Sequence, residues 1–245
     1  DSRNRLWVGT KLGLNMIDDD GHMRVFTIHQ GLPNDNINCA FEDHEGGLWF
    51  GTDGAGVLRY AGDRFVTFTV KEGLCSDLTM AMVRDSLGDL WLGTYDNGVC
   101  RMDGMAMVNT VDGLPNNTVW CGIKDRKGRL WFGTSDGLAR IDRGVVDPLP
   151  DPLRMAGQRV LALMEDAEGV VWCGTRDGLS SIAVDGTLNQ YPTAPAGPGR
   201  SVRRINPDGH GGLWLATEQG LGHLVNGRYS TYTTEQGLSD NTVLS

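Results

Sequence analysis

Apolar residues occur along this chain in short runs separated by turns rich in Gly, Asp and Asn, and no stretch shows the 3.6-residue period of a helix. Runs such as residues 5–10, 37–42 and 64–70 have the length and composition of β-strands. One run returns six times as Leu-Trp-x-Gly-Thr, with Val for Leu in the fifth copy and Ala for Gly in the sixth. Its tryptophans, spaced 40 to 42 residues apart, are Trp7, Trp49, Trp91, Trp131, Trp172 and Trp214. The chain is therefore a repeat protein.

A tight turn precedes each tryptophan strand. An aspartate stands six residues before every one of these tryptophans, and Gly, or Asn4 in the first copy, stands three residues before it. Asp side chains bond nearby backbone N–H groups, and Gly and Asn adopt positive φ at little cost. We therefore interpret the aspartates as turn formers; they are Asp1, Asp43, Asp85, Asp125, Asp166 and Asp208.

The repeat period leaves room for four short strands. A Gly-Leu-Pro loop, here called the feeder loop and first seen at residues 31–36, leads into one strand, and the tryptophan strand and two others follow. This arrangement predicts an all-β fold, a β-propeller of six four-stranded blades forming one domain over residues 1–245. Residues 237–245 match a feeder loop and its strand, so we expect the two chain ends to share the last blade. The alternative is that the repeats are a fragment of a larger propeller.

Charge and cysteine content narrow the functional classes. The net charge of −9 disfavours a nucleic-acid partner. The five cysteines have no Cys-x-x-Cys spacing, and we expect small buried hydrophobes rather than a disulfide framework or metal ligands. No apolar run approaches the roughly 20 residues of a membrane span. The chain opens inside a repeat without Met, which suggests a processed or excised piece.

The repeat resembles a known family. Gly-Leu-Pro-x-x-x-x, then Asp-x-x-Gly-x-Leu-Trp-x-Gly-Thr, then Gly-Leu is similar to the two-component regulator propeller repeat, most strongly at residues 31–60, 73–102 and 113–142. That family forms the extracytoplasmic sensor region of bacterial hybrid histidine kinases and of some GGDEF diguanylate cyclases. The resemblance implies a periplasmic sensor propeller, often for glycan fragments, joined to a membrane span and a cytoplasmic output domain. It further implies an oligosaccharide or small polar ligand, no cofactor, membrane tethering through segments outside this sequence, and homodimerisation of the full-length protein as an option.

Departures from the repeat indicate where a ligand could bind, because blade formation does not require them. The fourth and fifth feeder loops, residues 148–154 and 192–200, lose Gly-Leu-Pro, and arginines accompany them. At the position of Arg204 the sister strands carry the small residues Cys39, Ala81, Cys121 and Ala162. A guanidinium there needs a partner, which is either an acidic ligand or an internal carboxylate. The predicted anion-binding cluster comprises Arg159, Arg176, Arg200, Arg203 and Arg204.

Polar loops around the predicted channel mouth supply further candidates. Tyr95, Asp96 and Asn97 could hydrogen-bond and stack on a sugar, and Trp120, outside the repeat position, could be a stacking platform. The competing interpretation is that turns favour Asn and Asp and that Trp120 packs in the core. The same two interpretations, ligand binding and turn formation, apply to the feeder-loop residues Asn34, Asp35, Asp77, Asn116, Asn117 and Asp240.

Catalysis is not expected. Residues 133–137 fit G-x-S-x-G, but no helix follows them. The five histidines lack metal-ligand spacing, and Asp18-Asp19-Asp20-Gly21 lacks the bidentate Glu of a calcium loop. Streptogramin lyase, a propeller with a comparable repeat rhythm, places a His at the channel mouth, whereas no histidine here falls on the predicted rim loops. A protein–protein scaffold is the other alternative, and its mark would be an exposed apolar patch.

Overall fold

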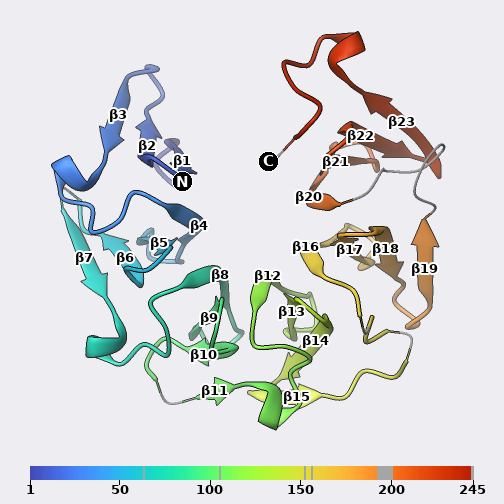
Figure 1. The fold of residues 1–245 in the computed structure, drawn as a ribbon, viewed down its shortest axis with the longest axis horizontal. Coiled ribbons are helices and arrows are strands. Elements are labelled where there is room, and N and C mark those ends of the chain that lie inside the picture. Colours follow the sequence, from blue (N-terminus) through green and yellow to red (C-terminus); the bar gives the residue numbers. More distant parts are fainter. Residues whose placement is uncertain (63, 105, 152, 156, 192–200, 244–245) are drawn as a thin grey trace. The chain divides into compact units, whose positions relative to one another are not determined.

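The strands form as the repeat predicts. The structure is a computed structural model that describes residues 1–62, 64–104, 106–151, 153–155, 157–191 and 201–243. Its described residues form six antiparallel sheets in chain order, five with four strands and one with three (Figure 1). The predicted all-β class and the sheet-by-sheet repeat are confirmed.

Each sheet is one repeat, and its strands lie side by side in chain order. The first sheet holds β1 (Leu6–Thr10), β2 (Gly13–Ile17) and β3 (Met23–Phe26). The second and third hold β4 (Ile37–Glu42), β5 (Leu48–Thr52), β6 (Val57–Tyr60) and β7 (Phe65–Phe68), and β8 (Thr79–Arg84), β9 (Leu90–Thr94), β10 (Val99–Arg101) and β11 (Met107–Val108). The fourth and fifth hold β12 (Val119–Lys124), β13 (Leu130–Thr134), β14 (Gly137–Asp142) and β15 (Val145–Asp147), and β16 (Val160–Glu165), β17 (Val171–Thr175), β18 (Gly178–Ile182) and β19 (Leu188–Tyr191). The sixth holds β20 (Val202–Pro207), β21 (Leu213–Thr217), β22 (Gly220–Val225) and β23 (Arg228–Tyr232).

The described chain divides into two compact units. One comprises Asp1–Val111 with Asn117–Val119, and the other comprises Asp112–Asn116 with Trp120–Ser245. The first unit contains the first three sheets and the second unit the last three. A single domain over residues 1–245 stays a prediction.

Neighbouring sheets of one unit pack through apolar side chains of the tryptophan strands. Between the first two sheets, the Trp7 ring centroid lies 5.4 Å from that of Phe50 and 5.0 Å from that of Tyr60. Leu14 and Leu58 are fully buried in the same cluster. A lone sheet could not bury these rings, so each sheet depends on its neighbour for a core.

The glycine of the tryptophan strands, present in all but the sixth, permits close approach of the next sheet. A Cβ on Gly174 would lie 2.7 Å from the carbonyl oxygen of Val202 in β20, and a Cβ on Gly51 would lie 3.0 Å from that of Thr79 in β8. Both distances are shorter than ordinary contacts, so a larger residue would push the sheets apart. The glycine in the repeat is therefore a packing requirement.

The closing strand at the chain ends is not formed among the described residues. The first sheet has three strands, and residues 237–243 contain no strand. Closure of the ring through a blade shared by both ends stays a prediction. No helix in the described parts of the chain is both long and apolar enough to cross a membrane.

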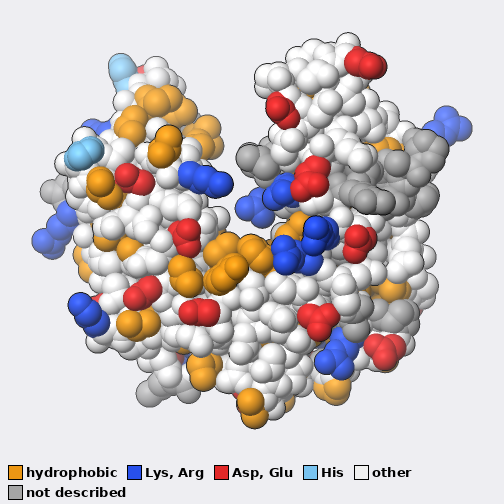
Figure 2. All heavy atoms as spheres, viewed as in Figure 1, with side chains coloured by type: hydrophobic (Ala, Val, Ile, Leu, Met, Phe, Trp, Pro, Cys, Tyr) orange, Lys and Arg blue, Asp and Glu red, His pale blue; other side chains and the backbone are white. Residues whose placement is uncertain are grey.

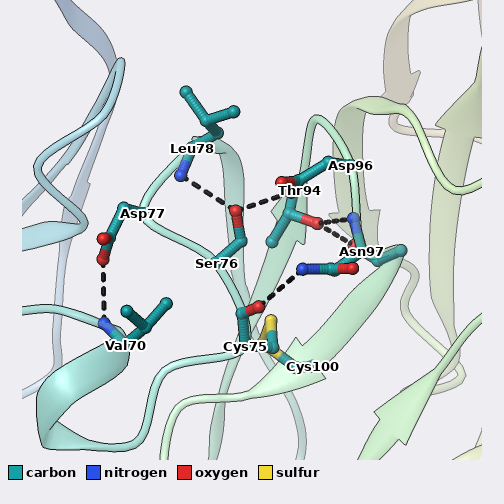
Figure 3. The surroundings of a disulfide bond; sticks show 10 residues. Val70, Cys75, Ser76, Asp77, Leu78, Thr94, Asp96, Asn97 and Cys100 are labelled. Carbon is teal, nitrogen blue, oxygen red and sulfur yellow. Dashed lines mark hydrogen bonds between the residues drawn. A yellow bond between two sulfur atoms is a disulfide. The ribbon is translucent and has the colours of Figure 1, made fainter.

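One disulfide corrects the cysteine prediction. Cys75, in the second feeder loop, is bonded to Cys100 in β10, with a Cα–Cα distance of 6.3 Å (Figure 3). The remaining Cys39, Cys121 and Cys173 are not in disulfides, and the last two are buried. Burial raises the pKa of the Cys121 thiol to about 12, which keeps it protonated and unreactive. The sequence prediction was right for these buried thiols and wrong for the bridged pair.

Candidate functional site

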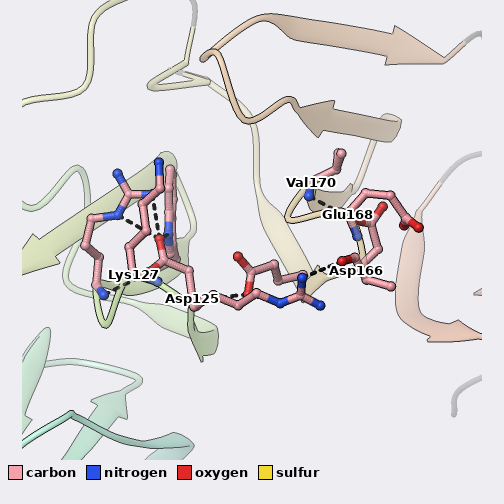
Figure 4. A network of polar contacts seen from close by, with 10 residues as sticks. Asp125, Lys127, Asp166, Glu168 and Val170 are labelled. Atoms are coloured by element: carbon pink, nitrogen blue, oxygen red, sulfur yellow. Dashed lines mark hydrogen bonds and ion pairs between the residues drawn. The ribbon is translucent and has the colours of Figure 1, made fainter.

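The turn aspartates bind the repeat tryptophans as well as the turn backbone. One carboxylate oxygen accepts hydrogen bonds from turn N–H groups, as Asp166 does from Glu168 and Val170 (Figure 4). The other oxygen accepts the indole N–H six residues later in five repeats, at donor–acceptor distances of 2.6 to 2.9 Å. The interpretation as turn formers is confirmed, and the bond to the tryptophan is the part that the turn pattern did not predict.

The sixth repeat uses a histidine in place of this indole. His223 Nε2 lies 2.9 Å from Asp208 Oδ2, the position that an indole nitrogen takes elsewhere. Trp214 instead stacks on the imidazole, with ring centroids 3.9 Å apart and planes inclined by 10°. His223 lies in β22 of the sixth sheet, and its side chain stabilises the turn that contains Asp208.

These contacts lower the pKa values of the aspartates. Burial raises the pKa of Asp43, but hydrogen bonds from the Trp49 indole and from two backbone N–H groups outweigh it, and the net pKa lies below the usual value. The same balance lowers the pKa of Asp85 and Asp125. The hydrogen bond from His223 is the main cause that lowers the pKa of Asp208 to about 2. All four aspartates are therefore ionised near neutral pH.

Acid should destabilise the protein through these groups. Because the folded-state pKa of Asp208 lies below its unfolded value near 3.8, its contribution to stability is complete above about pH 4 and is lost as the pH falls towards 2. We expect the melting temperature to fall steeply between pH 5 and pH 2.5, and we expect the fall to be shallower in Asp208→Asn. The control Asp19→Asn changes an exposed acid of a hairpin tip and should retain the wild-type profile. Parallel profiles for wild type and Asp208→Asn would contradict this role of Asp208.

The feeder loops use their polar side chains internally. Short 3-10 turns precede the four Gly-Leu feeder loops, at η1 (Ile28–Gln30), η2 (Val70–Glu72), η3 (Thr110–Asp112) and η4 (Thr234–Gln236). The first N–H of each turn donates to a side-chain oxygen seven residues later, which belongs to Asp35, Asp77, Asn117 or Asn241. For these residues the interpretation as loop formers holds.

The predicted residues Tyr95, Asp96 and Asn97 lie in the first unit on the loop after β9. Asp96 Oδ1 accepts the Ser76 hydroxyl at 2.6 Å, and Asn97 Nδ2 donates to the Cys75 carbonyl at 2.8 Å (Figure 3). With the disulfide, these bonds fasten the second feeder loop to the third sheet, into which it leads. The Tyr95 side chain is exposed, and it also interacts with other residues of the protein. Asp96 and Asn97 therefore have a local structural role.

The arginines gather in the second unit, where backbone bonds join their segments. The N–H of Arg176, after β17, donates to the carbonyl of Arg159 at 3.0 Å, and the N–H of Ser201 donates to the carbonyl of Arg176 at 2.8 Å. Arg203 and Arg204 follow Ser201 at the start of β20, where the pairing with β21 shifts register between Val202 and Arg204. Figure 2 shows Lys and Arg side chains grouped over β16 and β20. Arg200 lies outside the described residues.

The four described arginines differ in their partners. Arg203 forms an ion pair with Glu218 at 2.5 Å, so for it the internal-carboxylate interpretation holds. Arg159, Arg176 and Arg204 are exposed, and none of them has a carboxylate partner within the described part of the chain. Arg204 lies close enough to Cys121 to act electrostatically on its thiol. Three exposed arginines therefore stand on adjoining segments of the second unit of an acidic protein.

Trp120, on β12, lies beside this group. Its indole N–H donates to the Ser135 hydroxyl at 2.8 Å, and the Arg159 guanidinium carbon lies 5.2 Å from the ring centroid. A cation over an aromatic face at this distance is a favourable cation–π contact. The structure therefore brings Trp120 and Arg159 together, and Trp120 is partly buried. We call Trp120, Arg159, Arg176 and Arg204 the arginine face.

One group of side chains has metal-ligand types. Ligand atoms of Asp18, Asp20 and His22, on an exposed hairpin tip of the first unit, lie within 4.8 Å of one another. His22 Nδ1 is 3.5 Å from Asp18 Oδ1, and its backbone N–H donates to the same oxygen at 2.8 Å. These contacts are those of a polar hairpin tip, and they give no further indication of a metal.

Comparisons with known proteins agree with the repeat. The profile of the family named two component regulator propeller matches residues 31–54 and 113–136. A comparison with curated proteins finds no match to the sequence.

Solved structures share the fold. The extracellular domain of BT4673 from B. thetaiotaomicron, described as a hybrid two component system, has a TM-score of 0.80 and 24% identity over 100% of this chain and 34% of its own. PorZ of Porphyromonas gingivalis, a surface component of the type-IX secretion system, has a TM-score of 0.75 and 19% identity over 100% of this chain and 42% of its own. Virginiamycin B lyase from Staphylococcus aureus has a TM-score of 0.73 and 16% identity over 95% of this chain and 81% of its own. These likenesses establish the fold alone, and this chain spans about a third of the BT4673 domain.

Proposed function

We propose that this chain, which carries two-component regulator propeller repeats, is an extracytoplasmic ligand-sensing module of a bacterial signal-transduction protein. Its ligand is an acidic glycan fragment or another small anionic molecule, and the arginine face binds it. The observation that carries this proposal is a set of three exposed arginines for which the described residues provide no carboxylate partner, one of them over a partly buried tryptophan, in a chain of net charge −9.

The chemistry of the arginine face fits a carboxylate on a ring. Planar guanidinium groups bind carboxylates through two parallel hydrogen bonds, and an indole face contacts the C–H face of a sugar. The Arg203–Glu218 ion pair lies in the same segment and could hold the neighbouring Arg204 in place. The apolar platform and the free cations together favour an acidic sugar over a neutral one.

A location outside the cytoplasm is supported by two observations. The Cys75–Cys100 disulfide is typical of an oxidising compartment such as the periplasm. The structural neighbour BT4673 is described as an extracellular domain. In this proposal, segments outside residues 1–245 tether the module to the inner membrane and join it to a histidine kinase or diguanylate cyclase output. Ligand binding would then bias the arrangement of a signalling homodimer.

The lyase alternative has less support. Virginiamycin B lyase shares the fold at 16% identity, and a variant of it that lacks one histidine is described as catalytically inactive. Here His223 is hydrogen-bonded to Asp208. The ring of His44, in the turn between β4 and β5, contacts Arg84 at the end of β8. Neither histidine is part of the arginine face. We therefore propose a non-enzymatic module.

A thermal-shift titration tests the proposal. We expect oligogalacturonate to raise the melting temperature of the wild type and maltotetraose to leave it unchanged. At 100 times the dissociation constant a ligand stabilises the folded state by about 2.7 kcal/mol, or about 5–10 °C for a chain of this size. Arg204→Ala and Arg176→Ala should abolish the shift.

The control is Arg143→Ala, because Arg143 is almost fully exposed at the turn between β14 and β15 and lies outside the arginine face. This variant should retain the full shift. If Arg204→Ala lowers the melting temperature of the free protein and leaves the shift intact, the arginine is structural. If acidic and neutral oligosaccharides both fail to raise the melting temperature, the scaffold alternative gains weight.

A further inference from the structure

A cavity of about 240 Å³ lies between the fourth and fifth sheets, within the second unit. Its apolar wall comprises Trp131, Leu153, Val171, Ile182 and Val184. An apolar cavity of about 150 Å³ already binds benzene, so this one has room for an aromatic ring. None of the residues around it belongs to the arginine face, so the cavity is independent of the ligand site proposed above.

The junction of the first two sheets has the same polar frame around its tryptophan. In both junctions an arginine pairs with the turn aspartate at 2.6 Å. Its guanidinium carbon lies over the tryptophan ring, 5.2 Å from the centroid in one junction and 5.5 Å in the other. The indole N–H donates to the same aspartate oxygen. The residues concerned are Asp1, Arg5 and Trp7 in the first sheet and Asp125, Arg129 and Trp131 in the fourth.

The two junctions differ in what lies beside the tryptophan. The ring centroid of Tyr60, in the second sheet, is 5.0 Å from that of Trp7. Ile182 is the counterpart of Tyr60 in the fifth sheet, because each pairs with the residue that precedes the tryptophan of its own sheet. The Tyr60 hydroxyl reaches the Gly62 carbonyl, and Val184, the counterpart of Gly62, lines the cavity. The cavity therefore corresponds to the space that the tyrosine ring fills.

No other ring replaces this tyrosine. In the second and fifth sheets the tryptophan has a ring partner from its own sheet, Phe68 or Tyr191, at centroid distances of 5.7 and 5.2 Å. Counted from the strand pairs, Leu149 stands at this position in the fourth sheet. Among the described residues, Trp131 has two cations as ring neighbours and no aromatic side chain. This junction thus lacks the ring that the other junctions within each unit contain.

Charged residues from two turns surround the mouth of the cavity. The backbone N–H of Arg126, in the turn of the fourth sheet, donates to Glu165 at 2.9 Å, and its guanidinium contacts the carbonyl of Ala167 in the fifth. Lys127 is exposed and has no carboxylate partner in the part of the chain that the structure describes. Glu168 lies on the neighbouring turn (Figure 4). One carboxylate on a ligand can therefore pair with Lys127, whereas the two glutamates disfavour a second negative charge.

From these observations we infer that the cavity binds a small aromatic monocarboxylate of the phenylacetate class. The ring packs between Trp131 and Ile182, in the space that corresponds to the Tyr60 ring. The carboxylate lies at the mouth, next to the Lys127 ammonium. A ring fits better than an aliphatic chain, because an indole with a guanidinium over it already packs against a ring at the matching junction.

Isothermal titration calorimetry of residues 1–245 tests the inference. We expect phenylacetate to bind roughly tenfold more tightly than acetate, which lacks the ring, or phenethylamine, which has the opposite charge. Ile182→Tyr supplies the ring of the matching junction from the chain itself, so it should weaken phenylacetate binding by roughly tenfold and keep the melting temperature at or above that of the wild type. Lys127→Ala should weaken binding by about fivefold, as expected for an exposed ion pair.

The matched control is Lys71→Ala, which changes an exposed lysine of the first unit and should bind phenylacetate as the wild type does. Absence of phenylacetate binding to the wild type would overturn the inference, and so would equal affinities for phenylacetate and phenethylamine. Unchanged affinity in Ile182→Tyr would place the ligand elsewhere. If Ile182→Tyr does not fold, unchanged affinity in Lys127→Ala overturns the inference by itself.

Discussion

Replacing Trp131 with alanine should lower the free energy of unfolding by about 3–5 kcal/mol, the usual cost of truncating a buried tryptophan. Trp131 is 2% exposed, and its indole N–H donates to Asp125 at 2.8 Å. The guanidinium groups of Arg129 and Arg140 lie 5.5 and 5.2 Å from its ring centroid. The substitution would leave a cavity, a carboxylate that has lost one of its hydrogen bonds, and two cations without their aromatic partner. Urea unfolding followed by circular dichroism measures the loss.

Two variants separate the contributions at this position. Trp131→Phe retains most of the ring volume and removes the hydrogen bond to Asp125, so it should cost about 1–2 kcal/mol. Trp214→Ala removes a tryptophan whose place next to the turn aspartate is taken by His223, and it should cost less than Trp131→Ala. Equal losses for Trp131→Phe and Trp131→Ala would mean that the hydrogen bond, and not the packing, dominates.

Removing the disulfide should have the second largest effect. The bridge joins residues 25 apart, and closing a loop of that length stabilises the folded state by about 3.5 kcal/mol in the chain-entropy account. The double variant Cys75→Ser with Cys100→Ser should therefore lose about that amount in urea unfolding. Dithiothreitol should destabilise the wild type to the same level and leave the variant unchanged.

Thiol counting checks the bridge independently of stability. Without reductant, the denatured wild type should take up three carbamidomethyl groups, on Cys39, Cys121 and Cys173, and with reductant it should take up five. Five groups without reductant would show that the bridge is absent in solution. The control Cys39→Ser should retain the dithiothreitol sensitivity of the wild type.

The sequence predicted those features that depend on neighbours along the chain. The tryptophan strands, the aspartate turns and the sheet-by-sheet order follow from the repeat, because each turn and hairpin forms within one period. The 3-10 turns before the feeder loops were missed, although Thr69 with Glu72 and then Gly73 is a readable signal of a capped turn. Two similar threonine caps, at Thr27 and Thr233, repeat it.

Other features depend on contacts that the sequence spacing does not encode. The Cys75–Cys100 bridge needs the second feeder loop to lie against β10, and no other repeat carries cysteines at either position. The exchange of Trp214 for His223 depends on their direct pairing across β21 and β22. The arginine face depends on backbone bonds between residues 159, 176 and 201. The sequence could therefore predict that arginines gather there, but it could not predict which of them has no carboxylate partner among the described residues.

The bond between the turn aspartate and the indole has a consequence for folding on the ribosome. Each such pair is only six residues apart, so the contact forms between residues that leave the exit tunnel almost together. Contacts of such short sequence separation have a small loop-closure cost and form quickly. Each tryptophan hairpin can therefore assemble during synthesis while later repeats are still being translated, and stacking against the next sheet follows as that sheet emerges.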